Sequence, residues 1–415
     1  MSSDGLFLDA AAAIGRSIVA DAVWHNSNCS WMGAVTRPSE STAEYHALGP
    51  SLYGGTAGVG LFLAQIANAT GDRSFRATAV GALRHAAALA RQSPVSRRDG
   101  FHAGSVGVAW AAARAALLLE EEELHARAVE VSTQLDVPSG PDRCPDLITG
   151  MAGSALGLLA LADELGNPRL VEEARAKGEI LISRATVTSH GWSWAIPARR
   201  YPAHLCGISH GAAGIGWALL ELFAATGDAR FRAAAMGAFA YERSWLDPVT
   251  GRWPDLRIRG QRRGPLAPID SGIAGTWCYG EAGIALTRLR AVAVLGPGPH
   301  SGDAEIAVET TRRHLADALP HAIDDLSLCH GLGGAADVLL DAAALFNPRW
   351  YQVADVVTEL GHVMLERYAD ADQQWACGTE GETTPGLFLG LSGIGWLFLR
   401  LHDPATPTPL APIRP

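Results

Sequence analysis

One six-residue pattern recurs seven times along this chain of 415 residues. Each copy contains Gly-x-x-Gly and precedes an apolar run; the copies are Tyr53–Gly58, His102–Gly107, Ile148–Gly153, Ser209–Gly214, Cys278–Gly283, Cys329–Gly334 and Phe388–Gly393. Their first glycines are separated by 49, 46, 61, 69, 51 and 59 residues, which is the length of two helices with their connections. The sequence therefore predicts a fold built from repeated pairs of helices.

The two helices of each repeat differ in character. The segment after each copy is apolar nearly all round, as in residues 59–67, which is typical of a buried helix. It often ends in glycine followed by Asp or Asn, because glycine suits the left-handed position after a helix and the polar residue caps the next one. That next segment is amphipathic, with arginines on one face of residues 74–92 and alanines on the other. Each repeat is thus predicted to pair a buried inner helix with an amphipathic outer helix.

The ends of the chain favour a closed ring over an open solenoid. With a helix near residues 6–22 counted as the first outer helix, seven inner and seven outer helices are expected. An open solenoid needs polar end caps, yet the last inner helix (391–399) is as apolar as the middle ones. We therefore predict an all-α fold, a double-layered α,α-toroid of seven helical-hairpin repeats and about 14 helices, with residues 1–415 forming a single domain.

Composition excludes several functional classes. A net charge of -10 argues against a nucleic-acid partner, and 48% hydrophobic residues with 18% charged residues indicate a globular chain. Neither a signal peptide nor an integral membrane segment is expected. Six cysteines are too sparse for a disulfide framework at this length. A reducing cytoplasm is the expected location, and metal binding is the expected use of any special cysteine pair.

Metal-binding residue types occupy matching positions in consecutive repeats. The position two before the first glycine holds Cys278 and Cys329, and the position one before it holds His210, Tyr279 and His330. If neighbouring repeats are neighbouring segments of a ring, these side chains converge at its centre. Two thiolates and an imidazole suit Zn²⁺, and three protein ligands leave one position open, as in catalytic sites. We expect Cys278, Cys329 and His330 to bind zinc; the alternative is that the cysteines are buried small apolar side chains.

Three further residues are candidates for catalysis. His210 is either a fourth ligand or an acid/base group beside the metal, and the second reading is favoured. Tyr279 either donates a hydrogen bond to a developing oxyanion or is a packed aromatic residue. Asp146 precedes Gly150 by four residues and either orients His210 or caps a helix.

The remaining polar residues of the repeats receive no catalytic role. His102 is expected across the ring from the metal. Three cysteines outside the repeat positions are expected to be structural; they are Cys144, Cys206 and Cys377.

Two connections are longer than the others. They span residues 187–206 and 246–276, and the second contains Arg257, Arg259, Arg262 and Arg263. Both precede repeats that carry the special residues, so we expect loops or short hairpins that form a substrate rim over the site. An ordinary surface connection is the alternative.

These motifs resemble those of the lanthionine synthetase C-like cyclases. The resemblance rests on Ser209-His-Gly211, Trp277-Cys-Tyr-Gly280 and Cys329-His-Gly331, with Asp146–Gly150 upstream, and it extends over nearly the whole chain. It implies an α,α-toroid, zinc bound by Cys278, Cys329 and His330, and proton transfer by His210 and Asp146. Family members often carry a functional arginine just before the Trp-Cys motif. Here that stretch is Gly272–Thr276, and the nearest arginine before it is Arg263.

The resemblance implies a peptide cyclase that adds cysteine thiols of a precursor peptide to dehydroalanine or dehydrobutyrine and forms thioether rings. The expected partners are the dehydrated precursor peptide and separate dehydration enzymes (a kinase/lyase or a dehydratase), because this chain contains no such module. Three alternatives remain: a zinc-dependent transferase of a small thiol such as glutathione, a prenyltransferase-like subunit, and a non-catalytic peptide-binding scaffold.

Overall fold

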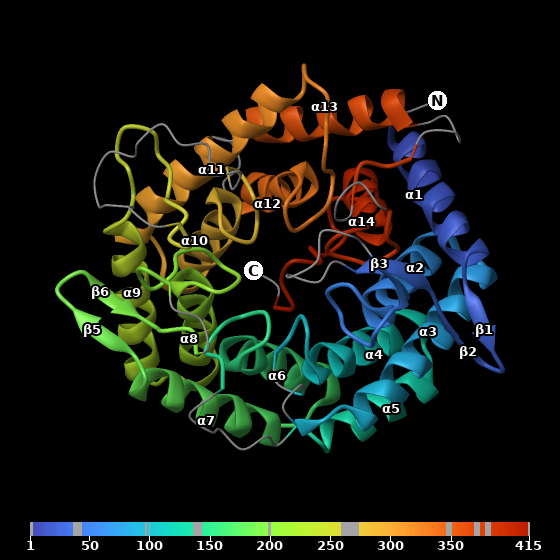
Figure 1. Ribbon diagram of the computed structural model, residues 1–415, viewed down its shortest axis with the longest axis horizontal. Helices are drawn as coiled ribbons and strands as arrows, with labels where there is room; N and C mark the ends of the chain where they lie inside the picture. Colours follow the sequence, from blue (N-terminus) through green and yellow to red (C-terminus); the bar gives the residue numbers. More distant parts are fainter. Residues whose placement is uncertain are drawn as a thin grey trace.

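The computed structural model describes residues 3–35, 44–95, 98, 100–135, 143–197, 201–258, 274–345, 351–368, 374–377 and 383–413. Helices dominate this part of the chain and stand in two concentric layers around a common axis (Figure 1). The fourteen helices found there form the double-layered α,α-toroid that the repeat pattern predicts.

Inner and outer helices alternate along the chain. The inner helices are α2 (Thr56–Thr70), α4 (Ser105–Leu119), α6 (Met151–Leu165), α8 (Ala212–Thr226), α10 (Glu281–Leu295), α12 (Leu332–Leu345) and α14 (Leu391–His402). The outer helices are α1 (Ser3–Ala20), α3 (Arg73–Gln92), α5 (Glu122–Ser132), α7 (Arg169–Ser183), α9 (Ala229–Arg243), α11 (Pro299–Ala318) and α13 (Tyr351–Tyr368). The first helix, α1, packs against the last, α14, and α14 also contacts α2 and α12, so the ring is closed.

Main-chain hydrogen bonds at the repeat motifs join all seven repeats in a circle. Taking the donor N–H first, the bonds run Tyr53 to His102, Ala103 to Ile148, Leu147 to Ser209, Ser209 to Cys278, Cys278 to Cys329, Cys329 to Phe388 and Phe388 to Tyr53. Their N···O distances lie between 2.8 and 3.3 Å. Since every repeat contributes the carbonyl oxygen two residues before its first glycine, this circle brings matching positions of consecutive repeats side by side. We call it the hub.

The second glycine of the motif is required by close backbone approach. A Cβ atom added to Gly283 would collide with the carbonyl oxygen of Trp277, and one added to Gly334 would collide with that of Leu328. The start of the inner helix thus lies directly on the turn before it, which leaves no room for any side chain. This contact fixes the turn that carries the hub residues relative to the helix that follows.

Helix ends follow the predicted chemistry. Gly71 and Gly227 end α2 and α8 with φ of 71° and 70°, the left-handed region that favours glycine. Asp72 and Asp228 then cap α3 and α9 by accepting hydrogen bonds from Ser74 N and Arg230 N at 2.7 and 2.9 Å.

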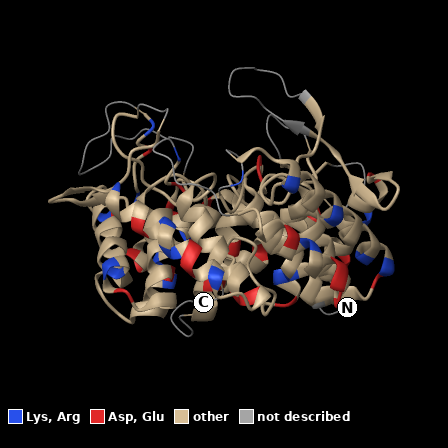
Figure 2. Ribbon diagram, turned by 90° about the horizontal axis from the view of Figure 1, so that it is seen from below, with Lys and Arg blue, Asp and Glu red and all other residues tan. Residues whose placement is uncertain are grey.

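Three antiparallel hairpins stand at the end of the ring where the inner helices begin. They pair β1 (Val23–His25) with β2 (Asn28–Ser30), β3 (Met32–Val35) with β4 (Glu44–Ala47), and β5 (Thr186–Thr188) with β6 (Gly191–Ser193). Figure 2 shows hairpin strands along one edge of the ring and the C-terminus at the opposite edge. The β5–β6 hairpin lies at the start of the first of the two long connections. In the second, the Asp247–Arg252 bridge closes a turn, and Arg259, Arg262 and Arg263 lie outside the described residues.

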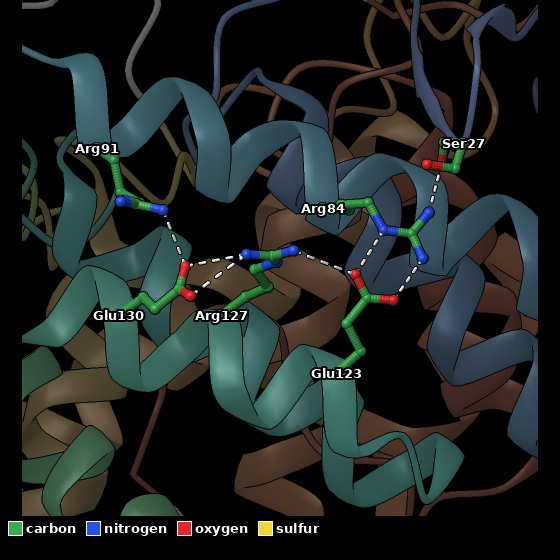
Figure 3. Close-up of polar contacts among 6 residues, drawn as sticks. All are labelled: Ser27, Arg84, Arg91, Glu123, Arg127 and Glu130. Atoms are coloured by element: carbon green, nitrogen blue, oxygen red, sulfur yellow. Dashed lines mark hydrogen bonds and ion pairs between the residues drawn. The ribbon is translucent and has the colours of Figure 1, made fainter.

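Ion pairs link outer helices on the surface (Figure 3). Arg84 of α3 binds Glu123 of α5 through two hydrogen bonds of 2.7 and 2.5 Å, and Arg127 of α5 lies between Glu123 and Glu130 at 3.5 and 3.1 Å. Exposed pairs of this kind contribute little singly, about 0–1 kcal/mol each. The shared carboxylates make them a network that fixes the spacing of neighbouring outer helices.

Candidate metal centre

Two hub turns bring the predicted ligands together. Cys278 precedes α10, Cys329 and His330 precede α12, and the ligand atoms of all three lie within 4.8 Å of one another. Cys278 Sγ lies 3.2 Å from His330 Nδ1. The two cysteines are buried while His330 is exposed, so the cluster is open to solvent on the His330 side.

The chemistry of these donors fits a divalent cation. A hydrogen bond from Cys329, and after it one from His330, hold the pKa of the Cys278 thiol well below its ordinary range despite burial. Burial and the neighbouring Cys278, in contrast, raise the pKa of Cys329 well above its ordinary range. If both cysteines were thiolates, their charges would repel each other unless a cation lay between them. Two sulfurs and one imidazole nitrogen form a ligand set that zinc prefers.

A hydrogen-bonded turn fixes the main chain at His330. Its main-chain N–H donates to Ser327 Oγ at 3.3 Å, and Ser327 N donates to Asp325 Oδ1 at 2.7 Å. This turn sets the direction in which the imidazole leaves the main chain.

A second pair, His210 and Asp146, lies one and two repeats before the Cys278 repeat. His210 Nδ1 hydrogen-bonds Asp146 Oδ2 in a short contact. The Asp146 side chain is only 2% exposed, whereas that of His210 is 32% exposed. Although burial opposes ionisation, the hydrogen bond and charge of His210 hold the pKa of Asp146 below its ordinary range. An ionised Asp146 accepts the Nδ1 proton, which leaves Nε2 as the nitrogen that exchanges a proton with a ligand.

Asp146 also binds residues of its own hub turn. Besides His210, its Oδ1 accepts from Thr149 N at 2.8 Å and from Thr149 Oγ1 at 3.1 Å, which is cap-like bonding within the hub turn. Cys144, expected to be structural only, donates from Sγ to Asp146 Oδ2 at 3.2 Å. Its position two residues before Asp146 was the sequence signal for this contact.

Glu242 of α9 anchors the turn that carries His210. Its Oε1 accepts hydrogen bonds from Gly207 N at 3.1 Å and Ala213 N at 2.8 Å, on either side of His210. The carboxyl is fully buried, and burial raises its pKa to about 7, although Arg288 opposes that shift. Sequence reasoning missed this residue because it lies on an outer helix, outside the repeat motif.

This raised pKa predicts a pH-dependent stability. Between pH 4.5 and about 7 the unfolded chain releases a Glu242 proton that the folded chain keeps. Stability should therefore fall as pH rises through this window, by up to about 3 kcal/mol. Glu242→Gln stays neutral and should remove this part of the slope. Urea unfolding of both proteins at pH 5 and pH 8 measures it, and identical slopes would show that the group does not titrate in this way.

Tyr279 lies between His210 and an arginine. Its ring centroid is 5.9 Å from that of His210, and the guanidinium carbon of Arg257 lies 4.0 Å from the Tyr279 ring centroid. The Tyr279 ring thus packs against both neighbours, and burial raises the pKa of its phenol. A neutral phenol remains able to donate a hydrogen bond. Arg257, grouped by sequence with the rim arginines, lies beside the site instead.

His102 and Tyr53 also lie near the metal centre. His102 belongs to the second repeat, across the ring from the Cys278 repeat, yet its ring centroid is 5.3 Å from that of Trp277, the residue before Cys278. The hub is narrow, so opposite repeats meet there. Tyr53, which occupies in the first repeat the position of Cys278 and Cys329, hydrogen-bonds the Cys329 thiol.

A cavity of about 890 Å³ lies at the other end of the ring and contains none of these residues. It is lined by inner-helix ends and the C-terminal segment, and its arginines pair with its own acidic residues, Arg114 with Glu164 and Arg290 with Glu221. The chemistry of the hub is absent there.

The chain matches one protein family and several solved structures. The family profile described as lanthionine synthetase C-like protein matches residues 46–411. Sequence comparison with curated proteins gives no match. Among solved structures, the chain is similar to nisin cyclase at 17% identity and a TM-score of 0.66, over 86% of this chain and 89% of that one. It is also similar to cellobiose 2-epimerase from Spirochaeta thermophila at 14% identity and a TM-score of 0.50, over 97% and 98%. At these identities, structural likeness establishes the toroidal fold alone. No helix in the described ranges is long and apolar enough to cross a membrane.

Proposed function

We propose, from the premise that this chain belongs to the lanthionine synthetase C-like family, that it is a zinc-dependent lanthipeptide cyclase. It adds cysteine thiols of a precursor peptide to dehydroalanine or dehydrobutyrine and forms lanthionine or methyllanthionine thioethers. The observation that carries the proposal is the Cys278, Cys329 and His330 cluster at the hub, with the His210–Asp146 pair beside it in the repeat order.

The ligand set leaves room for a substrate thiol. Cys278, Cys329 and His330 would hold the zinc ion as three protein ligands. When bound, zinc supplies an open coordination position and a positive charge that lowers the pKa of a thiol placed there. His330 is exposed, so a peptide can approach the three candidate ligands from its side.

Side chains of the protein transfer the protons during the addition. His210 Nε2 takes the thiol proton or returns a proton to the α-carbon, while Asp146 fixes the ring orientation and stabilises the imidazolium that forms. The new bond joins sulfur to the β-carbon, and the electrons of the carbon–carbon double bond move toward the amide oxygen. Tyr279 donates a hydrogen bond to that oxygen. The thiol hydrogen ends on the α-carbon, so the addition needs no oxidant or leaving group.

The remaining proposals concern the domain organisation, the partner enzymes and the location of the protein. Residues 1–415 act as one cyclase domain. Separate kinase/lyase or dehydratase enzymes supply the dehydrated peptide. The proposed thiolate ligands need a reducing compartment, so we place the protein in the cytoplasm.

Mass spectrometry tests the function directly. A dehydrated candidate precursor is incubated with and without the protein and then treated with a thiol-alkylating reagent. Cyclisation keeps the peptide mass unchanged and removes alkylable thiols. If the peptide instead gains the mass of added glutathione, the protein is a small-thiol transferase. If it binds the peptide without changing it, the protein is a scaffold.

The rim arginines provide a further prediction. Arg259, Arg262 and Arg263 precede the Cys278 repeat in an acidic chain, and we propose that they bind acidic residues of the precursor or a partner enzyme. Changing all three to Gln should raise KM about tenfold at low salt, since each rim charge contributes up to about 1 kcal/mol. The effect should shrink at high salt while zinc content stays constant. The triple Lys variant is the control, and an unchanged KM at low salt would refute this role.

A further inference from the structure

The segment that carries Arg257 is anchored to the helical ring by a buried tryptophan. Trp253 is buried, its indole donates to the main-chain oxygen of Glu242 at 3.0 Å, and its main-chain N–H donates to Glu281 Oε1 at 3.4 Å. Glu281 begins α10, directly behind the Cys278 turn, and its Oε2 also accepts from Gly275 N at 2.8 Å. The same buried carboxylate therefore holds both the Arg257 segment and the metal-binding turn.

Arg257 itself is held in one orientation. Asp255 is 4% exposed, and its carboxylate accepts Arg257 N and Nε at 2.9 Å and the terminal nitrogen Nη2 at 2.7 Å. The guanidinium carbon lies 4.0 Å from the Tyr279 ring centroid, a cation–π distance. A planar guanidinium can bind a carboxylate through two nitrogens and stack on a ring at the same time. A lysine ammonium cannot do both, so these contacts fix the orientation of an arginine.

Arg257 lies next to the candidate ligands. Tyr279, whose ring it contacts, directly follows Cys278 in the hub turn, so the guanidinium is placed beside the metal centre. The Arg257 side chain is still 37% exposed, so a bound molecule can approach the guanidinium. A fixed, partly exposed cation beside an electrophilic centre is suited to negative charge that forms there.

We propose that Arg257 is the cationic group of this site, stabilising the negative charge that passes from the thiolate sulfur to the amide oxygen of the dehydrated residue during addition. The proposal rests on the proposed cyclase function for its substrate. In the step, the sulfur lone pair forms the bond to the β-carbon and the enolate oxygen takes the charge beside Arg257. Protonation of the α-carbon then restores the amide. The position before the Trp-Cys motif holds no arginine in this chain, and Arg257 reaches the site from the preceding connection instead.

The matched control is Arg230. It binds Asp228 as Arg257 binds Asp255: the acceptor lies two residues before it, and the main-chain N–H and Nε bonds to Asp228 Oδ1 are 2.9 and 3.1 Å. Arg230, however, begins α9 at the opposite end of the ring. Arg257→Gln should lower kcat about 10²-fold, as loss of one oxyanion donor does, with unchanged zinc content and melting temperature. Arg257→Lys should recover part of this loss, and Arg230→Gln should behave as wild type.

A binding measurement separates this proposal from the cyclase function. The cobalt-substituted protein is titrated with N-acetylcysteinamide, a thiol without other charge, and the cobalt–thiolate absorption is followed. We expect Arg257→Gln to bind the probe about tenfold more weakly at low salt than wild type and Arg230→Gln. Weaker binding in a protein that cyclises no peptide would retain the role of Arg257 as cationic group and reject the cyclase. Equal binding by wild type and Arg257→Gln would overturn the proposal, whatever the wild-type activity.

Discussion

Replacing Cys329 with alanine is expected to remove both bound zinc and cyclisation while the helical ring stays folded. The thiol is buried at the hub, and the two remaining ligands leave zinc with only two protein donors, fewer than catalytic sites use. Metal analysis should fall from about one zinc per chain to near zero, and turnover should fall to background. Cys278→Ala should behave in the same way.

The ring should tolerate this change because metal does not hold it together. Its closure depends on the hub hydrogen bonds and on the packing of α1 and α14, both of which are formed by the protein alone. Circular dichroism and melting temperature test this. Cys377→Ala, a change at a buried free cysteine outside the hub positions, is the control and should keep its zinc. Full zinc occupancy in both Cys278→Ala and Cys329→Ala would exclude the proposed ligand set.

The repeat register explains why the meeting of Cys278, Cys329 and His330 could be predicted from sequence. Cys278 and Cys329 are 51 residues apart, and only their shared position before the repeat glycine suggested contact. The main-chain hydrogen bond from Cys278 N to Cys329 O, 3.3 Å long, joins these two matching positions directly. The starts of the inner helices followed for the same reason, since the first glycine of the repeat is the N-cap of α2, α4, α6, α8, α10 and α14.

Residues outside the register could not be placed by this argument. Glu242 lies on an outer helix and Arg257 in a connection of irregular length, so no periodicity relates either to the hub. Both reach the site through buried partners, Glu242 through two main-chain N–H groups and Arg257 through Asp255. The contact of His102 with Trp277 could not be foreseen for a different reason: the sequence gives the order of the repeats around the ring but not the width of the hub.

Replacing His210 with asparagine should leave zinc content unchanged and lower the cyclisation rate by about 10²–10⁴-fold, the usual cost of losing one proton-transfer group. Asparagine can still donate to Asp146, so the buried carboxylate keeps a partner, but it cannot carry a proton between substrate atoms. Zinc analysis and single-turnover kinetics measure the two effects. His204→Asn is the control, because His204 lies on the same connection but hydrogen-bonds Ser193 at 2.8 Å. Reduced zinc in His210→Asn would make His210 a fourth ligand.

The His210–Asp146 contact also predicts the cyclisation rates of an Asp146 variant and of the double variant. Asp146 acts through His210, so Asp146→Asn should also slow cyclisation, because an amide can donate to Nδ1 and favour the wrong tautomer. Once His210 is asparagine, the tautomer no longer matters. The double variant should then be about as slow as His210→Asn alone, which is the non-additivity expected of groups that act as a unit. If the two losses multiply instead, Asp146 has a role independent of His210, and the Thr149 contacts that shape the hub turn are the place where it would act.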